Sequence, residues 1–115
     1  MKFEFKVEEL NEIVIIHFIG SIFDKSEATD LLTSIDDYLE KGTNKFIVNL
    51  SQIDYMNSSG LGILINILTK SRNKYGELVV CEIPDKVVKL LVTSKLKNIF
   101  KITESQDLAI EKLNK

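Results

Sequence analysis

Cysteine, histidine and proline each occur only once in this sequence, and tryptophan is absent. The one cysteine, Cys81, has no partner for an intrachain disulfide, and the one histidine, His17, gives no ligand cluster for zinc, haem or an iron–sulfur group. One proline and five glycines leave no composition for a disordered linker. The chain of 115 residues, 44% apolar and 28% charged, is therefore typical of one globular domain spanning residues 1–115.

Long hydrophobic runs are also missing. No segment approaches the roughly 18 consecutive apolar residues that a membrane helix needs. The start, Met1-Lys2-Phe3-Glu4, alternates instead of opening the apolar block of a signal peptide. A cytoplasmic protein without a membrane partner is expected.

The net charge of −2 is small but unevenly distributed. Residues 1–57 hold 11 acidic and 5 basic side chains, whereas residues 58–115 hold 6 acidic and 10 basic ones. A stretch without acids contains five lysines, Lys86, Lys89, Lys95, Lys97 and Lys101. This stretch is either a basic surface that binds nucleic acid or an acidic protein partner, or it is a lysine-rich face exposed to solvent. The pI of 5.4 and the lack of arginine there favour the solvated face, so no direct nucleic-acid partner is expected.

Hydrophobic periodicity predicts an alternation of strands and helices. The expected strands are 3–8, 13–18, 45–50, 77–82 and 99–102, with Gly20 ending the second. The expected helices are 26–42 with Ser26 as N-cap, 58–73, one that begins at Pro84, and 104–113. The order ββαβαβαβα predicts an α/β domain with a mixed sheet of four to five strands and helices mainly on one face.

The most informative segment is the loop Asp54-Tyr55-Met56-Asn57-Ser58-Ser59-Gly60-Leu61-Gly62, between an expected strand and an expected helix. Asn57 or Ser58 can cap that helix. Gly60 and Gly62 weaken the same first turn, because each glycine inside a helix costs about 1 kcal/mol relative to alanine. We therefore expect that something approaches this backbone closely or that bulk is excluded there.

The helix after this loop carries two apolar ridges. One ridge consists of Leu61, Leu64, Ile65 and Leu68, and Ile63 and Ile67 form a second one further round the cylinder. The helix either packs against both a sheet and a neighbouring helix, or it presents an apolar patch to a partner.

The residues offer little for catalysis. A serine nucleophile needs a base within hydrogen-bond reach, and His17 lies in the second expected strand among apolar residues. The G-x-S-x-G, Walker and dinucleotide motifs are all absent. An enzyme, a cofactor and a metal site are therefore not expected. A serine at a helix N-terminus can instead receive a phosphate, whose charge the free N–H groups tolerate. A capped turn without function is the alternative.

The loop and the element order resemble the STAS domain of bacterial anti-sigma-factor antagonists. The likeness includes Gly20, the segment Gly76-Glu77-Leu78-Val79-Val80-Cys81 and residues 96–102. The resemblance implies that an anti-sigma factor serine kinase phosphorylates Ser58 and that a PP2C-type phosphatase removes the phosphate. It also implies that the unphosphorylated protein binds the kinase and frees a sigma factor.

The resemblance places partner contacts around the serine. The expected partner-binding residues are Phe23, Asp24, Asn57, Ser59, Gly60, Leu61, Gly62 and Ile63. The sequence departs from the family pattern at two places. Asn57 stands where many members have aspartate. The usual Gly-x-Leu-Asp segment is Gly20-Ser21-Ile22-Phe23 here, so the acidic residue comes one position later, at Asp24. Phe23 is either a contact or a buried anchor. The alternative function is a constitutive scaffold or a transporter-associated subunit without phosphorylation, and a weak homodimer is left open.

Overall fold

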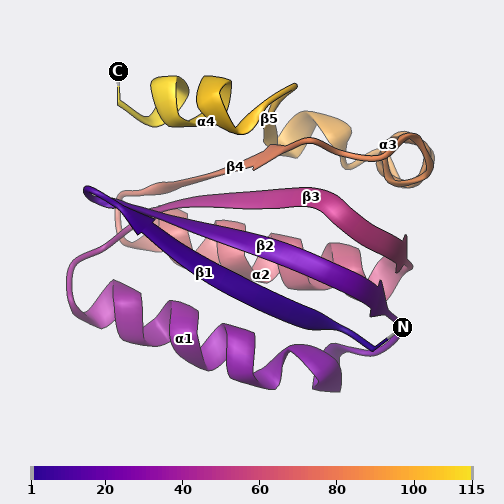
Figure 1. Ribbon diagram of the computed structural model, residues 1–115, viewed down its shortest axis with the longest axis horizontal. Coiled ribbons are helices and arrows are strands. Elements are labelled where there is room, and N and C mark those ends of the chain that lie inside the picture. The colour runs from indigo at the N-terminus through magenta and orange to yellow at the C-terminus, as the bar shows by residue number, and fades with distance from the viewer. Residues whose placement is uncertain (1, 115) are drawn as a thin grey trace.

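A computed structural model describes residues 2–114, so that Met1 and Lys115, the ends of the predicted domain, lie outside the described residues. Its sheet has the strand order β1-β2-β3-β4-β5, with an antiparallel β1–β2 pair and parallel pairs elsewhere (Figure 1). The elements are β1 (Glu4–Leu10), β2 (Ile13–Ile22), the 3-10 turn η1 (Lys25–Ala28), α1 (Thr29–Glu40), β3 (Lys45–Met56), α2 (Ser58–Asn73), β4 (Glu77–Cys81), α3 (Asp85–Thr93), the 3-10 turn η2 (Lys97–Ile99), β5 (Lys101–Thr103) and α4 (Gln106–Leu113). The predicted ββαβαβαβα order and mixed sheet are confirmed.

The two faces of the sheet are covered unequally. The larger core cluster joins one face to α1, α2 and α3 and includes Leu31, Leu64 and Val87. On the opposite face α4 alone covers a smaller cluster, which includes Ala109 and Leu113 (Figure 1). The prediction that helices lie mainly on one face is therefore confirmed, and α4 is the exception.

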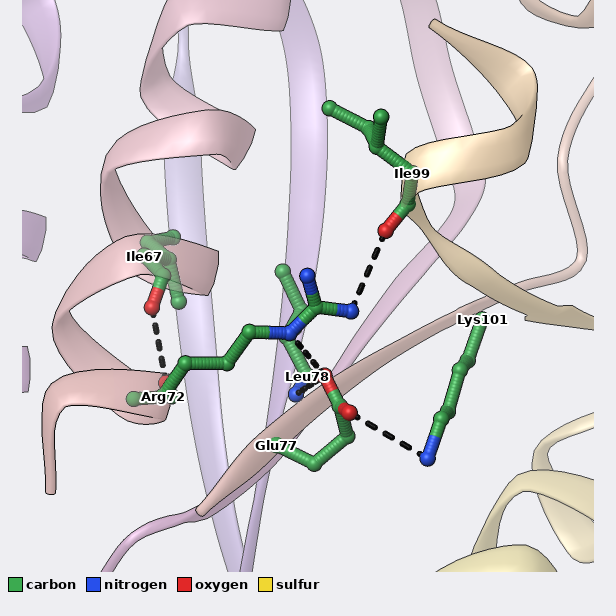
Figure 2. Close-up of polar contacts among 7 residues, drawn as sticks. Ile67, Arg72, Glu77, Leu78, Ile99 and Lys101 are labelled. Carbon is green, nitrogen blue, oxygen red and sulfur yellow. Dashed lines mark hydrogen bonds and ion pairs between the residues drawn. The ribbon is translucent and has the colours of Figure 1, made fainter. Parts of the chain in front are cut away.

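An ion-pair network fastens the C-terminal end of α2 to the sheet (Figure 2). Arg72 Nε lies 3.1 Å from Glu77 Oε1, and Lys101 Nζ lies 3.2 Å from Glu77 Oε2. Arg72 Nη2 also donates to the backbone oxygen of Ile99 at 3.2 Å. Burial alone would raise the pKa of Glu77, but the N–H of Leu78 and the two cations outweigh it and lower this pKa. Lys101 is thus engaged within the fold.

Three strands extend further than predicted, and one of them, β1, reaches Leu10. Gly20 does not end β2 but lies inside it at φ 89°, and β3 continues past Leu50 to Met56. The extra pairing accommodates register shifts after His17 and after Gly20. Such irregularities bend the strand, and they break the two-residue alternation from which strand length is read. The extended β3 leads directly into the serine loop.

Some predicted helix and strand ends were wrong. Ser26 is not an N-cap, because Asp24 caps η1 in a capping box with Glu27, and α1 itself begins at Thr29. The last strand begins at Lys101, since residues 97–99 form η2. In both cases a short 3-10 turn precedes the regular element and takes up residues that were assigned to it.

Candidate functional site

Asn57 joins two loops at the start of α2. Its Oδ1 accepts a hydrogen bond from the Ser59 N–H at 2.9 Å, which confirms a cap at this turn and assigns it to Asn57. Its Nδ2 donates to the backbone oxygen of Phe23 at 3.1 Å, in the connection between β2 and η1. Ser58 is the first residue of α2 and is exposed.

The expected close approach to the glycines is confirmed, and the approaching groups belong to this chain. A Cβ atom at Gly60 would overlap Met56 Cγ and lie 3.1 Å from Met56 Sδ. A Cβ atom at Gly62 would lie 2.9 Å from Lys25 Cε. The buried Gly60 therefore admits the methionine side chain at the end of β3.

Both ridges of α2 are buried. Ile63 is 1% exposed and Ile67 is fully buried, and Leu61, Leu64 and Leu68 of the first ridge are buried as well. Packing on two sides is therefore confirmed, and an apolar partner patch on this helix is wrong. Leu61 at 2% exposure and Ile63 offer no side-chain surface to a partner, and neither does buried Gly60. The predicted partner-binding residues with accessible atoms are Phe23, Asp24, Asn57, Ser59 and Gly62.

An exposed aromatic pair stands beside Asn57. The rings of Phe23 and Tyr55 stack with centroids 5.0 Å apart and an interplanar angle of 26°. Phe23 is 60% exposed and Tyr55 is 44% exposed, so the buried-anchor alternative for Phe23 was wrong. Sequence reasoning missed Tyr55, because the strand was expected to end at Leu50. Residues 51–56 show no regular two-residue alternation of buried and exposed side chains, so no local signal could have located it.

The one histidine is engaged within the sheet. His17 Nε2 lies 3.2 Å from Glu8 Oε1, and His17 pairs with Asn49 in the middle of the sheet. Within residues 2–114 no group of three His, Cys, Asp or Glu side chains could hold a metal ion. Cys81 is buried, and burial, followed by the charge of Glu82, raises its pKa to about 12. The thiol is thus neutral and unreactive at neutral pH.

The structure also has a cavity that lies away from the serine loop. A cavity of about 490 Å³ lies between α3 and the ends of β4 and β5, with Glu82, Asp85, Lys97 and Glu104 among its lining residues, and it includes no residue of the serine loop. Over the part of the chain that the structure describes, no helix has the length and apolar character needed to cross a bilayer.

The site is thus an exposed serine at a capped helix start, flanked by exposed aromatic rings on an α/β scaffold. The sequence model of the STAS domain family matches residues 4–109, and the chain belongs to this family. A putative anti-sigma factor antagonist of Thermotoga maritima is 30% identical over 80 residues, which cover 70% of this chain and 71% of that protein.

Further similarities agree with this assignment. The putative anti-sigma factor antagonist BtrV of Bordetella bronchiseptica is 25% identical over 96 residues, which cover 84% of this chain and 83% of that protein. The crystal structure of the Thermotoga maritima protein superposes with a TM-score of 0.80 at 26% identity and covers 96% of this chain and 95% of that one. The phosphorylated form of the Bacillus cell fate determinant SpoIIAA shares the fold, with a TM-score of 0.74, 20% identity and coverage of 95% of this chain and 98% of that one.

Proposed function

We propose that the protein is a cytoplasmic anti-sigma factor antagonist whose binding is switched by a phosphate on Ser58. The unmodified protein binds an anti-sigma factor serine kinase, which releases a sigma factor or another regulated partner. The kinase transfers a phosphoryl group from ATP to Ser58 and lets go, and a PP2C-type phosphatase restores the hydroxyl. The protein itself catalyses no reaction in this scheme.

The observation that carries the proposal is the exposure of Ser58 at the first position of α2. A phosphate adds about −1.5 to −2 charges at neutral pH, and a helix N-terminus tolerates such charge. Because Asn57 already caps the helix through Ser59, the fold does not depend on the Ser58 hydroxyl for its cap. Modification therefore changes the surface that a partner meets while the scaffold stays intact. The relatives named as anti-sigma factor antagonists support the partner class.

The aromatic pair supports a protein partner. Exposed aromatic side chains dominate the energetics of many protein interfaces, and Phe23 and Tyr55 stand beside Asn57, which precedes Ser58. A partner that covers both rings also covers the serine, where a hydrated dianion would prevent close contact. We expect Phe23→Ala to weaken kinase binding at least tenfold. Leu108→Ala, which truncates an exposed apolar side chain of α4, is the matched control and should leave binding unchanged.

The decisive experiment is phosphorylation by the anti-sigma serine kinases of the source organism with ATP, followed by peptide mass spectrometry. We expect phosphate on Ser58 of the unaltered protein. The Ser59→Ala variant should still be phosphorylated, and the Ser58→Ala variant should not. No phosphate with any of these kinases would reject the switch. We further expect Ser58→Asp to weaken kinase binding and Ser58→Ala to preserve it. Equal affinities would instead favour a constitutive scaffold or a transporter-associated subunit.

A further inference from the structure

The side chain of Lys25 crosses the first turns of α2. A Cβ atom at Gly62 would lie 2.9 Å from Lys25 Cε and 3.4 Å from Lys25 Nζ. Lys25 is exposed, and its ammonium group takes part in none of the ion pairs or side-chain hydrogen bonds found within residues 2–114. A positive charge without a carboxylate partner therefore lies against the helix, in the space that a side chain at position 62 would fill.

That space borders Ser58. Positions 58 and 62 are four residues apart in α2, so they lie on the same helical face with Cβ positions about 5–6 Å apart. A helical side chain also covers the surface of the turn that precedes its own Cα atom. Lys25 Nζ lies 3.4 Å from the Cβ position of residue 62, so it is no more than about 10 Å from the Cβ position of Ser58, and a phosphate on Ser58 is within reach of this flexible side chain.

The backbone around Lys25 is held in place. The N–H groups of Phe23 and Asp24 both donate to Glu27 Oε1 at 2.9 Å, and the backbone oxygen of Phe23 accepts from Asn57. The carboxylates of Asp24 and Glu27 are thereby turned toward backbone N–H groups. Lys25 thus projects from a segment that is fixed to the serine loop itself.

We propose that Lys25 is the phosphate-binding residue of the switch, whose ammonium group pairs with a phosphate on Ser58. Gly62 is the position that allows the lysine to cross the helix. This inference rests on the proposed function only in requiring that Ser58 carries phosphate. The pairing holds the phosphate over the first turn of α2 and keeps it dianionic, so that the switch is fully charged when it repels a partner.

The test uses full-length protein with phosphoserine encoded genetically at position 58, so that no kinase is needed, and follows its titration by phosphorus NMR. A nearby cation lowers the second pKa of the phosphate, ordinarily about 6. We expect Lys25→Met to raise this pKa by about 0.2–0.7 units, the range for a solvent-exposed ion pair. The matched control is Lys86→Met, which removes an exposed lysine from α3 and should leave the pKa unchanged.

The carboxylates around the site, Asp24, Glu27 and Asp54, remain in both variants, so their repulsion cancels in the comparison. Lys25→Arg should retain the low pKa, because it keeps the charge. Equal titrations of Lys25→Met and Lys86→Met would overturn the proposal. A shift in Lys25→Met together with no phosphorylation by any kinase would reject the proposed function and leave the lysine assignment standing. Phosphorylation of Ser58 by a kinase together with no shift in Lys25→Met would overturn the lysine assignment and leave the proposed function standing.

Discussion

Replacing a glycine of α2 with alanine should change the free energy of unfolding in opposite directions at Gly60 and at Gly62. Neither Gly60 nor Gly62 has a positive φ, so alanine fits the backbone at both. In a helix, alanine is favoured over glycine by about 1 kcal/mol. At Gly62 the new methyl group meets Lys25 Cε at 2.9 Å, and this exposed, flexible side chain can move aside. We expect Gly62→Ala to raise the free energy of unfolding by about 0.5–1 kcal/mol.

At Gly60 the same methyl group meets a buried side chain near its point of attachment, where it has less room to move aside. Met56 is 6% exposed and belongs to the main core cluster, and the methyl group would overlap its Cγ. Overpacking of a core costs about 1–3 kcal/mol. After subtraction of the gain of about 1 kcal/mol in helix propensity, Gly60→Ala should lower the free energy of unfolding by up to about 2 kcal/mol.

A double-mutant cycle separates the steric term from the backbone term. In the Met56→Ala background the obstacle is gone, so Gly60→Ala should become neutral or stabilising, with a coupling energy of about 1–3 kcal/mol. Urea denaturation measures all four proteins, and an unchanged m-value shows that the states compared are the same. Equal stabilisation by Gly60→Ala and Gly62→Ala in the original background would refute the reasoning, as would a Gly60→Ala effect that ignores Met56.

Three further predictions concern single side chains. Asn57→Ala should lower the free energy of unfolding in urea by about 0.5–2 kcal/mol through loss of the cap, whereas Asn57→Asp keeps the accepting oxygen and should lose less. The pKa of Glu77 is lowered in the folded protein, so its ionised carboxylate stabilises the fold. Relative to Glu77→Gln, this stabilisation should be complete above the pKa of the unfolded state, about 4.3, and should vanish as the pH falls through the pKa of the folded state. Urea denaturation of both proteins from pH 7 to pH 3 measures the difference. Cys81 should react with Ellman's reagent only as fast as the protein unfolds; rapid stoichiometric labelling of the folded protein would contradict its burial.

The parts of the fold that sequence reasoning predicted depend on near neighbours along the chain. The cap at Asn57 joins residues two positions apart, and the helix that follows was read from apolar spacing within four residues. Both signals come from side chains that act on their own turn of backbone. The element order followed from such local patterns, which is why it was predicted correctly.

The parts that were missed depend on pairing between distant segments. β3 extends to Met56 because β2 continues to pair with it past irregularities near His17 and Gly20, and no local pattern in residues 51–56 encodes that partner. Tyr55 is brought to Phe23 by the same pairing. The sequence indicated that something approaches the glycines, but only the extended strand identifies Met56 as the group above Gly60.

This packing also bears on how a phosphate could act. The backbone around Ser58 is fixed by the Asn57 cap, by the bond from Asn57 to Phe23 and by the methionine packed on Gly60. A modification that shifts a conformational equilibrium needs two states with different affinity for it, and these contacts favour one state of the loop. On the proposed function, phosphate then acts through charge and hydration at the surface. Amide shifts between the serine and phosphoserine proteins should accordingly stay within the β2–η1 connection and the first turns of α2, and widespread shifts through β4 and α4 would indicate a conformational switch instead.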